Sequence, residues 1–167
     1  FYHFYESVKN FNMNKQKICI VGDGLSGLTS AICINQLPNI EVTLIAKKGQ
    51  KNTDKRTTAI SESNFKFLNE NVQKLNFKLF WPSKNIKLFY ESNEQKINFL
   101  NLQEKNTNLM YVFENDKVKD FIFKKIVKSK IKVIRKEIKS LNELKKYDLI
   151  ILCLGGNSKV YQKIIKN

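Results

Sequence analysis

Three glycines near the start of the chain have the spacing of a phosphate-binding loop. Gly22, Gly24 and Gly27 form Gly-x-Gly-x-x-Gly within KICIVGDGLSGLTSAI, which runs from residue 17 to residue 32. In dinucleotide-binding units the first glycine permits a tight turn, the second lets the backbone approach a pyrophosphate, and the third lets the helix pack closely. The start of the helix then offers free N–H groups and the positive end of a dipole. Glycine at the third position favours FAD or NAD, and the alternative is a strand, turn and helix that bind no ligand.

The position that usually binds the ribose carries no acid. A dinucleotide-binding unit commonly ends its second strand with Asp or Glu, which accepts hydrogen bonds from ribose hydroxyls. Here that place is taken by Ala46, and Lys47 and Lys48 follow it. The two lysines could face a 2′-phosphate, which would indicate NADP. Because lysine is common throughout this chain, NADP remains the second choice.

The segment DKRTTAIS, residues 54–61, follows the second expected strand and contains Arg56. Arginine is rare here, since the chain has only Arg56 and Arg135 among its 30 basic residues. A planar guanidinium that is always charged suits a bound pyrophosphate. The alternative is an ordinary solvated residue of a surface loop.

The residue types of the chain do not predict a zinc site or a histidine-based catalytic triad. The single histidine is His3, and the cysteines are Cys19, Cys33 and Cys153, each in an apolar run. These residues cannot form a zinc site or a histidine-based triad. An odd number of scattered cysteines is typical of buried thiols in a reducing cytoplasm. We therefore nominate no catalytic residue and no metal ligand.

The pattern of apolar residues predicts an α/β fold. Strands are expected at 17–21, 41–46, 131–134 and 147–156, and helices at 26–37, 57–72 and 115–127. The last strand is almost continuously apolar and is expected at the centre of a sheet, and Asn115 is a candidate N-cap. Two further runs, 86–91 and 96–102, flank SNEQ and predict a hairpin. Strand, glycine loop, helix and strand form a βαβ unit, so we expect a Rossmann-type parallel core with an inserted hairpin.

The charge of the chain is extreme, yet it does not by itself indicate a nucleic-acid partner. The formal net charge is +15 over 167 residues, and 28 of the 30 basic residues are lysine. Nucleic-acid interfaces favour arginine, and the lysines here are spread along the whole chain. We therefore expect no nucleic-acid binding. The longest apolar run, DLIILCLGG, is too short to span a bilayer, so a cytoplasmic protein with at most peripheral membrane association is expected.

Four blocks of the sequence resemble a known family. ICIVGDGLSGLTSA, DKRTTAIS, YVFENDKVKDFI and YDLIILCLGGNSKVY are similar to segments of the ubiquinone-biosynthesis aromatic hydroxylases, which are flavin monooxygenases related to p-hydroxybenzoate hydroxylase. The resemblance implies an FAD-binding core, with Arg56 lying along the cofactor and Glu114 and Asn115 approaching it. Together with the glycine loop, the candidate cofactor-binding residues are Gly22, Gly24, Leu25, Ser26, Gly27, Ala46, Lys47, Arg56, Thr57 and Glu114.

The same resemblance implies the reaction. NAD(P)H would reduce FAD, the reduced flavin would activate O₂, and an aromatic ubiquinone precursor would be hydroxylated without a protein nucleophile. The alternatives from the residues themselves are a small NAD(P)-binding reductase or regulator, and a basic nucleic-acid-binding module.

The chain departs from the family in two positions and in extent. Leu154-Gly155 stands where the family has Asp-Gly, and Ala46 stands where it has Glu, so two carboxylates expected beside the cofactors are missing. The resemblance covers 15–161 but matches only the N-terminal part of the family. We expect a leader without function at 1–12 and an FAD-binding domain at 13–167, with part of the substrate-domain sheet around 80–110. Such a truncated chain is expected to be inactive alone, unless a second chain supplies the remainder.

Overall fold

The computed structural model describes residues 15–47, 54–91 and 96–155. These residues fall into two compact units. The first contains 15–47 and 126–155, and the second contains 54–91 and 96–125. The expected leader at 1–12, together with His3 and Lys48, lies outside the described residues.

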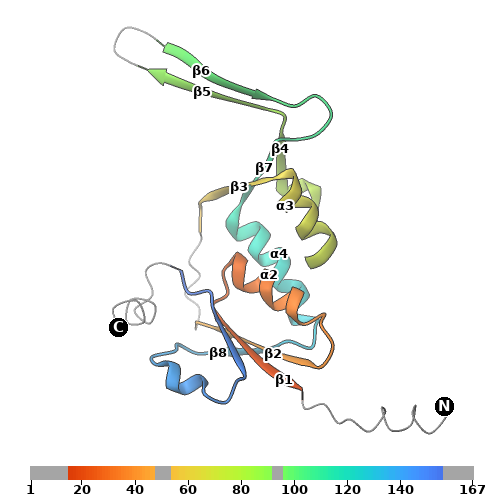
Figure 1. Ribbon diagram of the computed structural model, residues 1–167, viewed down its shortest axis with the longest axis vertical. Coiled ribbons are helices and arrows are strands. Elements are labelled where there is room, and N and C mark those ends of the chain that lie inside the picture. Colours follow the sequence, from red (N-terminus) through yellow and green to blue (C-terminus); the bar gives the residue numbers. More distant parts are fainter. Residues whose placement is uncertain (1–14, 48–53, 92–95, 156–167) are drawn as a thin grey trace, which may run out of the picture. The chain divides into compact units, whose positions relative to one another are not determined.

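The first unit is built on a parallel sheet of four strands in the order β8-β2-β1-β9 (Figure 1). The strands are β1 (Gln16–Val21), β2 (Ile40–Ala46), β8 (Lys132–Arg135) and β9 (Leu149–Leu152). Helix α2 (Leu25–Ile34) connects β1 to β2 and packs on both, which completes the predicted βαβ unit. The α/β class, the parallel core and all four strands of this unit are thus confirmed.

Side chains alternate between the two faces of the sheet along each strand, and each face is covered by different parts of the chain. On one face, Cys19, Val21 and Ile45 form a buried cluster with Ile138 and with Leu144 of the 3₁₀ helix η3 (Leu141–Leu144). Side chains of neighbouring residues point to the opposite face, on which α2 packs with its own buried residues. Both faces are apolar because both are covered, as is usual for parallel sheets.

The prediction that the 147–156 run forms a central strand is wrong for the part of the sheet that is described. Strand β9 pairs with β1 alone there, and Leu149 is 50% exposed. The apolar run indicates that both faces of the strand are covered, which does not require a partner strand on both edges. Composition therefore predicts burial of the two faces, but it does not predict whether the strand is central or at an edge of the sheet.

The second unit contains an antiparallel sheet in the order β3-β7-β4, made of β3 (Thr57–Ser61), β4 (Phe80–Ser83) and β7 (Met110–Glu114). Helix α3 (Glu62–Phe67), the π-helical turn η1 (Leu68–Val72) and the 3₁₀ turn η2 (Phe77–Leu79) lie between β3 and β4. Aromatic rings fill the core: Phe65 stacks on Tyr111 with ring centroids 3.9 Å apart, and its edge meets Phe80.

The predicted helix at 57–72 is wrong at its start. Residues Thr57–Ser61 form strand β3, which pairs with β7, and the helix begins only at Glu62. The β-branched side chains of Thr57, Thr58 and Ile60 favour an extended backbone. Ser61 then ends the strand and caps α3, because its hydroxyl accepts a hydrogen bond from the Asn64 backbone N–H.

Helix α4 (Asn115–Val127) confirms the predicted amphipathic helix, with Val118, Ile122 and Ile126 buried along one face. Asn115 is the first residue of the helix and does not precede it as an N-cap would. Its side chain instead accepts a hydrogen bond from the Thr58 hydroxyl and donates one to Asp54.

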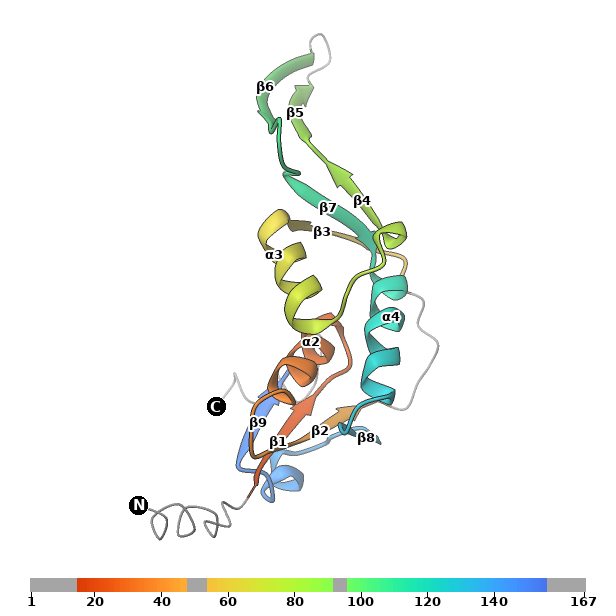
Figure 2. The same cartoon turned by 90° about the vertical axis from the view of Figure 1, so that its right-hand side faces the viewer.

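The predicted hairpin is also confirmed. Strand β5 (Asn85–Glu91) pairs antiparallel with β6 (Lys96–Gln103), and Figure 2 shows the pair as a two-stranded ribbon between β4 and β7 in the chain order. No helix in the three described ranges has the length and apolar character needed to cross a membrane.

Candidate functional site

The glycine loop follows strand β1 and leads directly into α2. Gly22 has φ +118°, a conformation that side chains other than hydrogen rarely adopt, and a Cβ there would collide with the backbone carbonyl of Cys153. A Cβ on Gly27 would collide with the backbone carbonyl of Gly22. The tight turn and the close helix packing predicted for the first and third glycines are therefore both present.

Gly24 differs from the other two glycines. Its φ of −70° and ψ of 174° are accessible to any residue, and a Cβ built there would have no neighbour within 4 Å among residues 15–47, 54–91 and 96–155. Neither the backbone conformation nor packing against the described residues requires glycine at this position. A ligand that approaches the backbone closely would require it, because a Cβ would occupy the space beside the start of α2.

The first turn of α2 has the features of an anion-binding site. Gly24 is the N-cap and provides no side-chain cap, and the first turn contains no acidic residue. The backbone N–H groups of Leu25, Ser26 and Gly27 lie in this turn, where an α-helix has no intrahelical acceptors for them. With the positive end of the helix dipole, these groups can bind a phosphate.

An ion pair joins the glycine loop to the edge of the sheet. Arg135 ends strand β8 and donates from Nη1 to Oδ2 of Asp23 at 3.1 Å. Asp23 lies between the first two glycines, so the pair places a cation beside the carboxylate of the loop. Sequence reasoning missed this role of Arg135, although its rarity and its place directly after an expected strand were available signals.

The end of β2 offers no carboxylate of its own. Ala46 is fully buried and lies in register with Arg135 on β8. The Lys47 ammonium lies 3.4 Å from a carboxylate oxygen of Glu137, and both side chains are largely exposed. Glu137 is thus the acid that the fold brings beside the end of β2.

A second polar group lies in the second unit, around Asp54. Its two carboxylate oxygens accept hydrogen bonds from Nε and Nη2 of Arg56 at 2.7 and 2.8 Å, and Asn115 donates to it at 3.1 Å. Hydrogen bonds from Arg56 and then Asn115 hold the pKa of Asp54 well below its usual range. The Arg56 side chain is 82% exposed. Asp54 therefore binds one edge of the guanidinium, and the rest of the guanidinium faces solvent.

Thr57 and Glu114 lie opposite each other on β3 and β7, at the end of the sheet next to Arg56. The Glu114 carboxylate accepts a hydrogen bond from Lys117 at 2.8 Å. The candidate residues therefore form two groups. The first unit carries Gly22, Gly24, Leu25, Ser26, Gly27, Ala46 and Lys47, and the second carries Arg56, Thr57 and Glu114.

Leu154 has a structural role in place of the Asp that the family resemblance would put there. Its side chain packs against the buried cluster that contains Cys19, Val21 and Leu144. A carboxylate at the same place would lose those apolar contacts. Gly155, which follows, has φ +72° and would not tolerate a side chain without strain.

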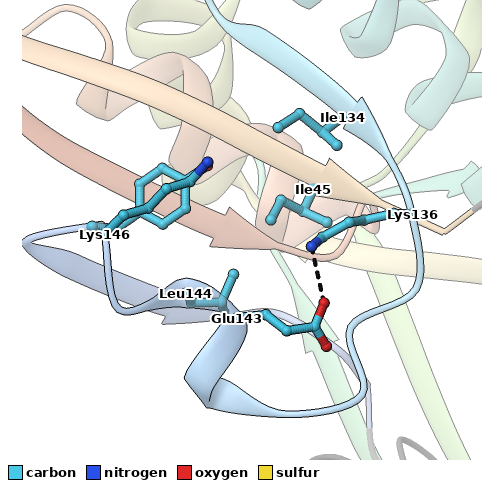
Figure 3. A pocket seen from close by; sticks show the side chains of 7 residues that line it. Ile45, Ile134, Lys136, Glu143, Leu144 and Lys146 are labelled. Atoms are coloured by element: carbon cyan, nitrogen blue, oxygen red, sulfur yellow. Dashed lines mark hydrogen bonds and ion pairs between the residues drawn. The ribbon is translucent and has the colours of Figure 1, made fainter.

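A small cavity of about 110 Å³ has two residues of η3, Glu143 and Leu144, in its lining (Figure 3). Ile45, Ile134 and Leu144 line it with Lys136, Glu143, Lys146 and Tyr147. Lys136 donates to Glu143 at 2.9 Å, and this bond together with backbone N–H donors lowers the pKa of Glu143 to about 2. Cofactor pockets are several times larger, roughly 300–1,000 Å³, so the cavity holds no dinucleotide.

The described thiols are poor nucleophiles. Burial raises the pKa of Cys19 to about 11, and it also raises the pKa values of Cys33 and Cys153. All three are therefore neutral near pH 7. Within the described ranges, no group of three or more His, Cys, Asp or Glu side chains could hold a metal ion.

Comparisons with known proteins find likeness in structure and not in sequence. No protein family model matches the chain, and no curated protein sequence matches it. The p-nitrophenol 4-monooxygenase PnpA from Pseudomonas putida DLL-E4 is similar with a TM-score of 0.57 and 11% identity, over 72% of this chain and 32% of that one. The tryptophan 6-halogenase SttH from Streptomyces toxytricini is similar with a TM-score of 0.51 and 12% identity, over 75% of this chain and 38% of that one.

These likenesses show a shared fold. The chain has the α/β architecture of a monooxygenase and of a halogenase whose names both identify an aromatic compound. It spans about a third of the length of PnpA and somewhat more of SttH.

Proposed function

We propose that this chain is the dinucleotide-binding portion of an FAD-dependent monooxygenase that acts on an aromatic compound. The observation that carries the proposal is Gly24. It is the glycine of the loop that neither the backbone conformation nor contacts with the described residues require, and it borders the uncapped start of α2. A pyrophosphate against that helix start explains why the position lacks a side chain.

The residues present fit FAD at the phosphates and depart from the usual set at the ribose. The N–H groups of Leu25, Ser26 and Gly27 would bind the pyrophosphate. Arg135 neutralises Asp23, so the loop does not oppose that charge. With Ala46 at the end of β2, Glu137 is the nearest replacement for the ribose acid, and it is bound to Lys47.

A second candidate is a small NADP-binding reductase, because two cations, Lys47 and Arg135, belong to the strand ends where a 2′-phosphate would lie. Each of these cations already has a carboxylate partner, Glu137 and Asp23 respectively. A 2′-phosphate would have to compete with those partners. The pairing therefore favours FAD over NADP.

The substrate class is proposed from two sources. The names of the structural neighbours identify a nitrophenol and tryptophan, and four blocks of this sequence resemble ubiquinone-pathway hydroxylases. Both point to an aromatic ring, and the second specifies a ubiquinone precursor. When bound and reduced by NAD(P)H, FAD would supply the activation of O₂, while the chain binds and orients the cofactor.

Hydroxylation requires more than cofactor binding. The ring must be held beside the flavin and water must be kept out. Because the chain spans only about a third of PnpA, we propose that further polypeptide contributes the rest of that enclosure.

The test is a titration of the purified protein with FAD and, separately, with NADP, followed by quenching of flavin fluorescence and by calorimetry. We expect saturable binding of FAD in a 1:1 complex and weaker binding of NADP. Tighter binding of NADP would assign the chain to the reductase alternative. Absence of binding of either nucleotide would overturn the proposal altogether.

A further inference from the structure

The ribbon of β5 and β6 has one apolar face and one polar face. Residues directly opposite each other on paired strands lie on the same face. The pairs Ile86–Leu102, Leu88–Leu100 and Tyr90–Ile97 alternate with pairs that are polar except for Phe89. Phe99 lies two residues after Ile97 and so belongs to the same face. The apolar face consists of seven residues, namely Ile86, Leu88, Tyr90, Ile97, Phe99, Leu100 and Leu102.

A β-bulge makes this face continuous. Leu88 pairs with Leu100 and the next residue, Phe89, pairs with Asn98, so β6 has one extra residue at this point. Without the extra residue, strict alternation would place Ile97 and Phe99 on the face opposite Leu100 and Leu102.

The other face of the ribbon is polar apart from Phe89. The Lys96 ammonium lies 4.9 Å from the centroid of the Phe89 ring, which places these two side chains on the same face. That face also carries Lys87, Asn98 and Asn101 by alternation. The ribbon is therefore amphipathic, and a partner is needed on one side only.

The apolar face is uncovered in the described part of the chain. Phe99 and Tyr90 are each 61% exposed and Ile97 is 50% exposed, with Leu88, Leu100 and Leu102 between 37% and 44%. A two-stranded ribbon alone is at best marginally stable in water. An apolar patch of this extent typically marks an interaction site.

Charge narrows the kind of partner. Residues 84–105 contain four lysines and three glutamates, a net charge of +1, whereas the whole chain carries +15. Anionic lipid and nucleic acid would be attracted to the rest of the chain more than to this ribbon. Two copies of the chain, which repel each other elsewhere, can approach here with little electrostatic cost.

We propose that this face binds the same face of a second copy of the chain. Two ribbons related by a twofold axis would stack as two layers about 10 Å apart and interdigitate their apolar side chains. Six of the seven side chains are between 37% and 61% exposed, and the whole face would bury on the order of 500 Å² per copy. That area lies at the lower end of specific interfaces, so we expect a weak dimer with a dissociation constant on the order of micromolar.

The experiment is sedimentation equilibrium of the full chain from about 1 to 100 µM, a range that brackets a micromolar dissociation constant. We expect a monomer–dimer equilibrium that shifts toward the dimer when salt rises from about 0.05 to 0.5 M, because salt screens the repulsion between basic copies. Phe99→Asp should weaken the dimer at least tenfold. Phe89→Asp is the matched control, since it changes the same residue type on the opposite face, and it should leave the dimer intact.

Both phenylalanines are exposed, so both variants should fold, and circular dichroism verifies this. A monomer throughout the concentration range, or equal effects of the two substitutions, would overturn the proposal. Sedimentation of a monomeric protein with phosphatidylglycerol vesicles, lost in Phe99→Asp, would also overturn it and assign the face to lipid. None of these outcomes depends on FAD, so the test is independent of the proposed function.

Discussion

Replacing Gly24 with alanine should separate ligand binding from folding. The new Cβ would have no neighbour within 4 Å in the part of the chain that the structure describes, and the φ of −70° suits alanine. Alanine is a poorer N-cap than glycine, but it also reduces the conformational entropy of the unfolded chain, and each effect amounts to roughly 0.5–1 kcal/mol. Because they have opposite signs, we expect the free energy of unfolding to change by less than about 0.5 kcal/mol.

Binding of FAD should respond much more strongly to Gly24→Ala. The Cβ would stand beside the helix start, where the pyrophosphate must approach the backbone. Loss of one hydrogen bond to a charged group costs about 1.5–3 kcal/mol, which corresponds to a roughly 10- to 100-fold weaker affinity.

Gly27→Ala is the matched comparison. Its Cβ would collide with the backbone carbonyl of Gly22, and a backbone atom cannot move aside cheaply. Overpacking of this kind costs about 1–3 kcal/mol of stability, although alanine has the higher helix propensity. Gly27→Ala should therefore lower stability and binding together.

The assays are thermal unfolding without ligand and flavin fluorescence titration on the same samples. The reasoning predicts a stable Gly24→Ala protein that binds FAD weakly and a destabilised Gly27→Ala protein. If Gly24→Ala binds FAD as the wild type does, no ligand closely approaches that backbone and the assignment of the loop fails. If it unfolds easily, the open space around Gly24 has been misjudged.

Four further outcomes are expected. Arg135→Gln should weaken FAD binding severalfold, because it removes the cation that offsets the charge of Asp23 beside the glycine loop. Asp23→Asn in the same chain should restore binding, and additive losses in the titrations would contradict the coupling. The pKa of Glu143 is about 2 in the folded protein, against an ordinary value of 4.5, so its carboxylate stabilises the fold at neutral pH. This contribution should fade as the pH falls from about 5 to 2. Thermal unfolding should therefore show a smaller loss of stability over this pH range in Glu143→Gln than in the wild type. Arg56→Ala should weaken FAD binding while Lys55→Ala changes it little, and equal titration curves would make Arg56 an ordinary surface charge. The chain alone, with FAD, NAD(P)H and a phenolic ubiquinone precursor, should consume little NAD(P)H and form no hydroxylated product by chromatography, so stoichiometric product would refute the need for further polypeptide.

The local signals in the sequence determined much of the first unit. Gly-x-Gly-x-x-Gly between an apolar strand and a helix specified the βαβ unit, because a tight turn and close helix packing can be met by few residue types. The hairpin was equally readable, since two apolar runs flank the short polar segment SNEQ. In both cases the residues that decide the structure are neighbours in the chain, so the signal survives without knowledge of the fold.

Pairing between distant residues was decided by the tertiary structure alone. Thr57–Ser61 continues a helix-like pattern in sequence, but its hydrogen bonds go to β7, some fifty residues later, and the segment is a strand. Arg135 and Asp23 are 112 residues apart and meet because parallel strands bring their carboxyl ends to one edge of the sheet.

The tertiary structure also decided how residues of the same type, or of the same apolar run, differ in their roles. The spacing of the three loop glycines predicts a role for each, but only the structure shows that a Cβ on Gly22 or Gly27 would collide with backbone of Cys153 or Gly22, whereas Gly24 has open space among the described residues. Likewise, Ile97 and Leu100 have opposite parity along β6, and only the bulge puts them on one face. Such roles depend on contacts with residues that are distant in the chain, and these contacts cannot be read from the type of a residue alone.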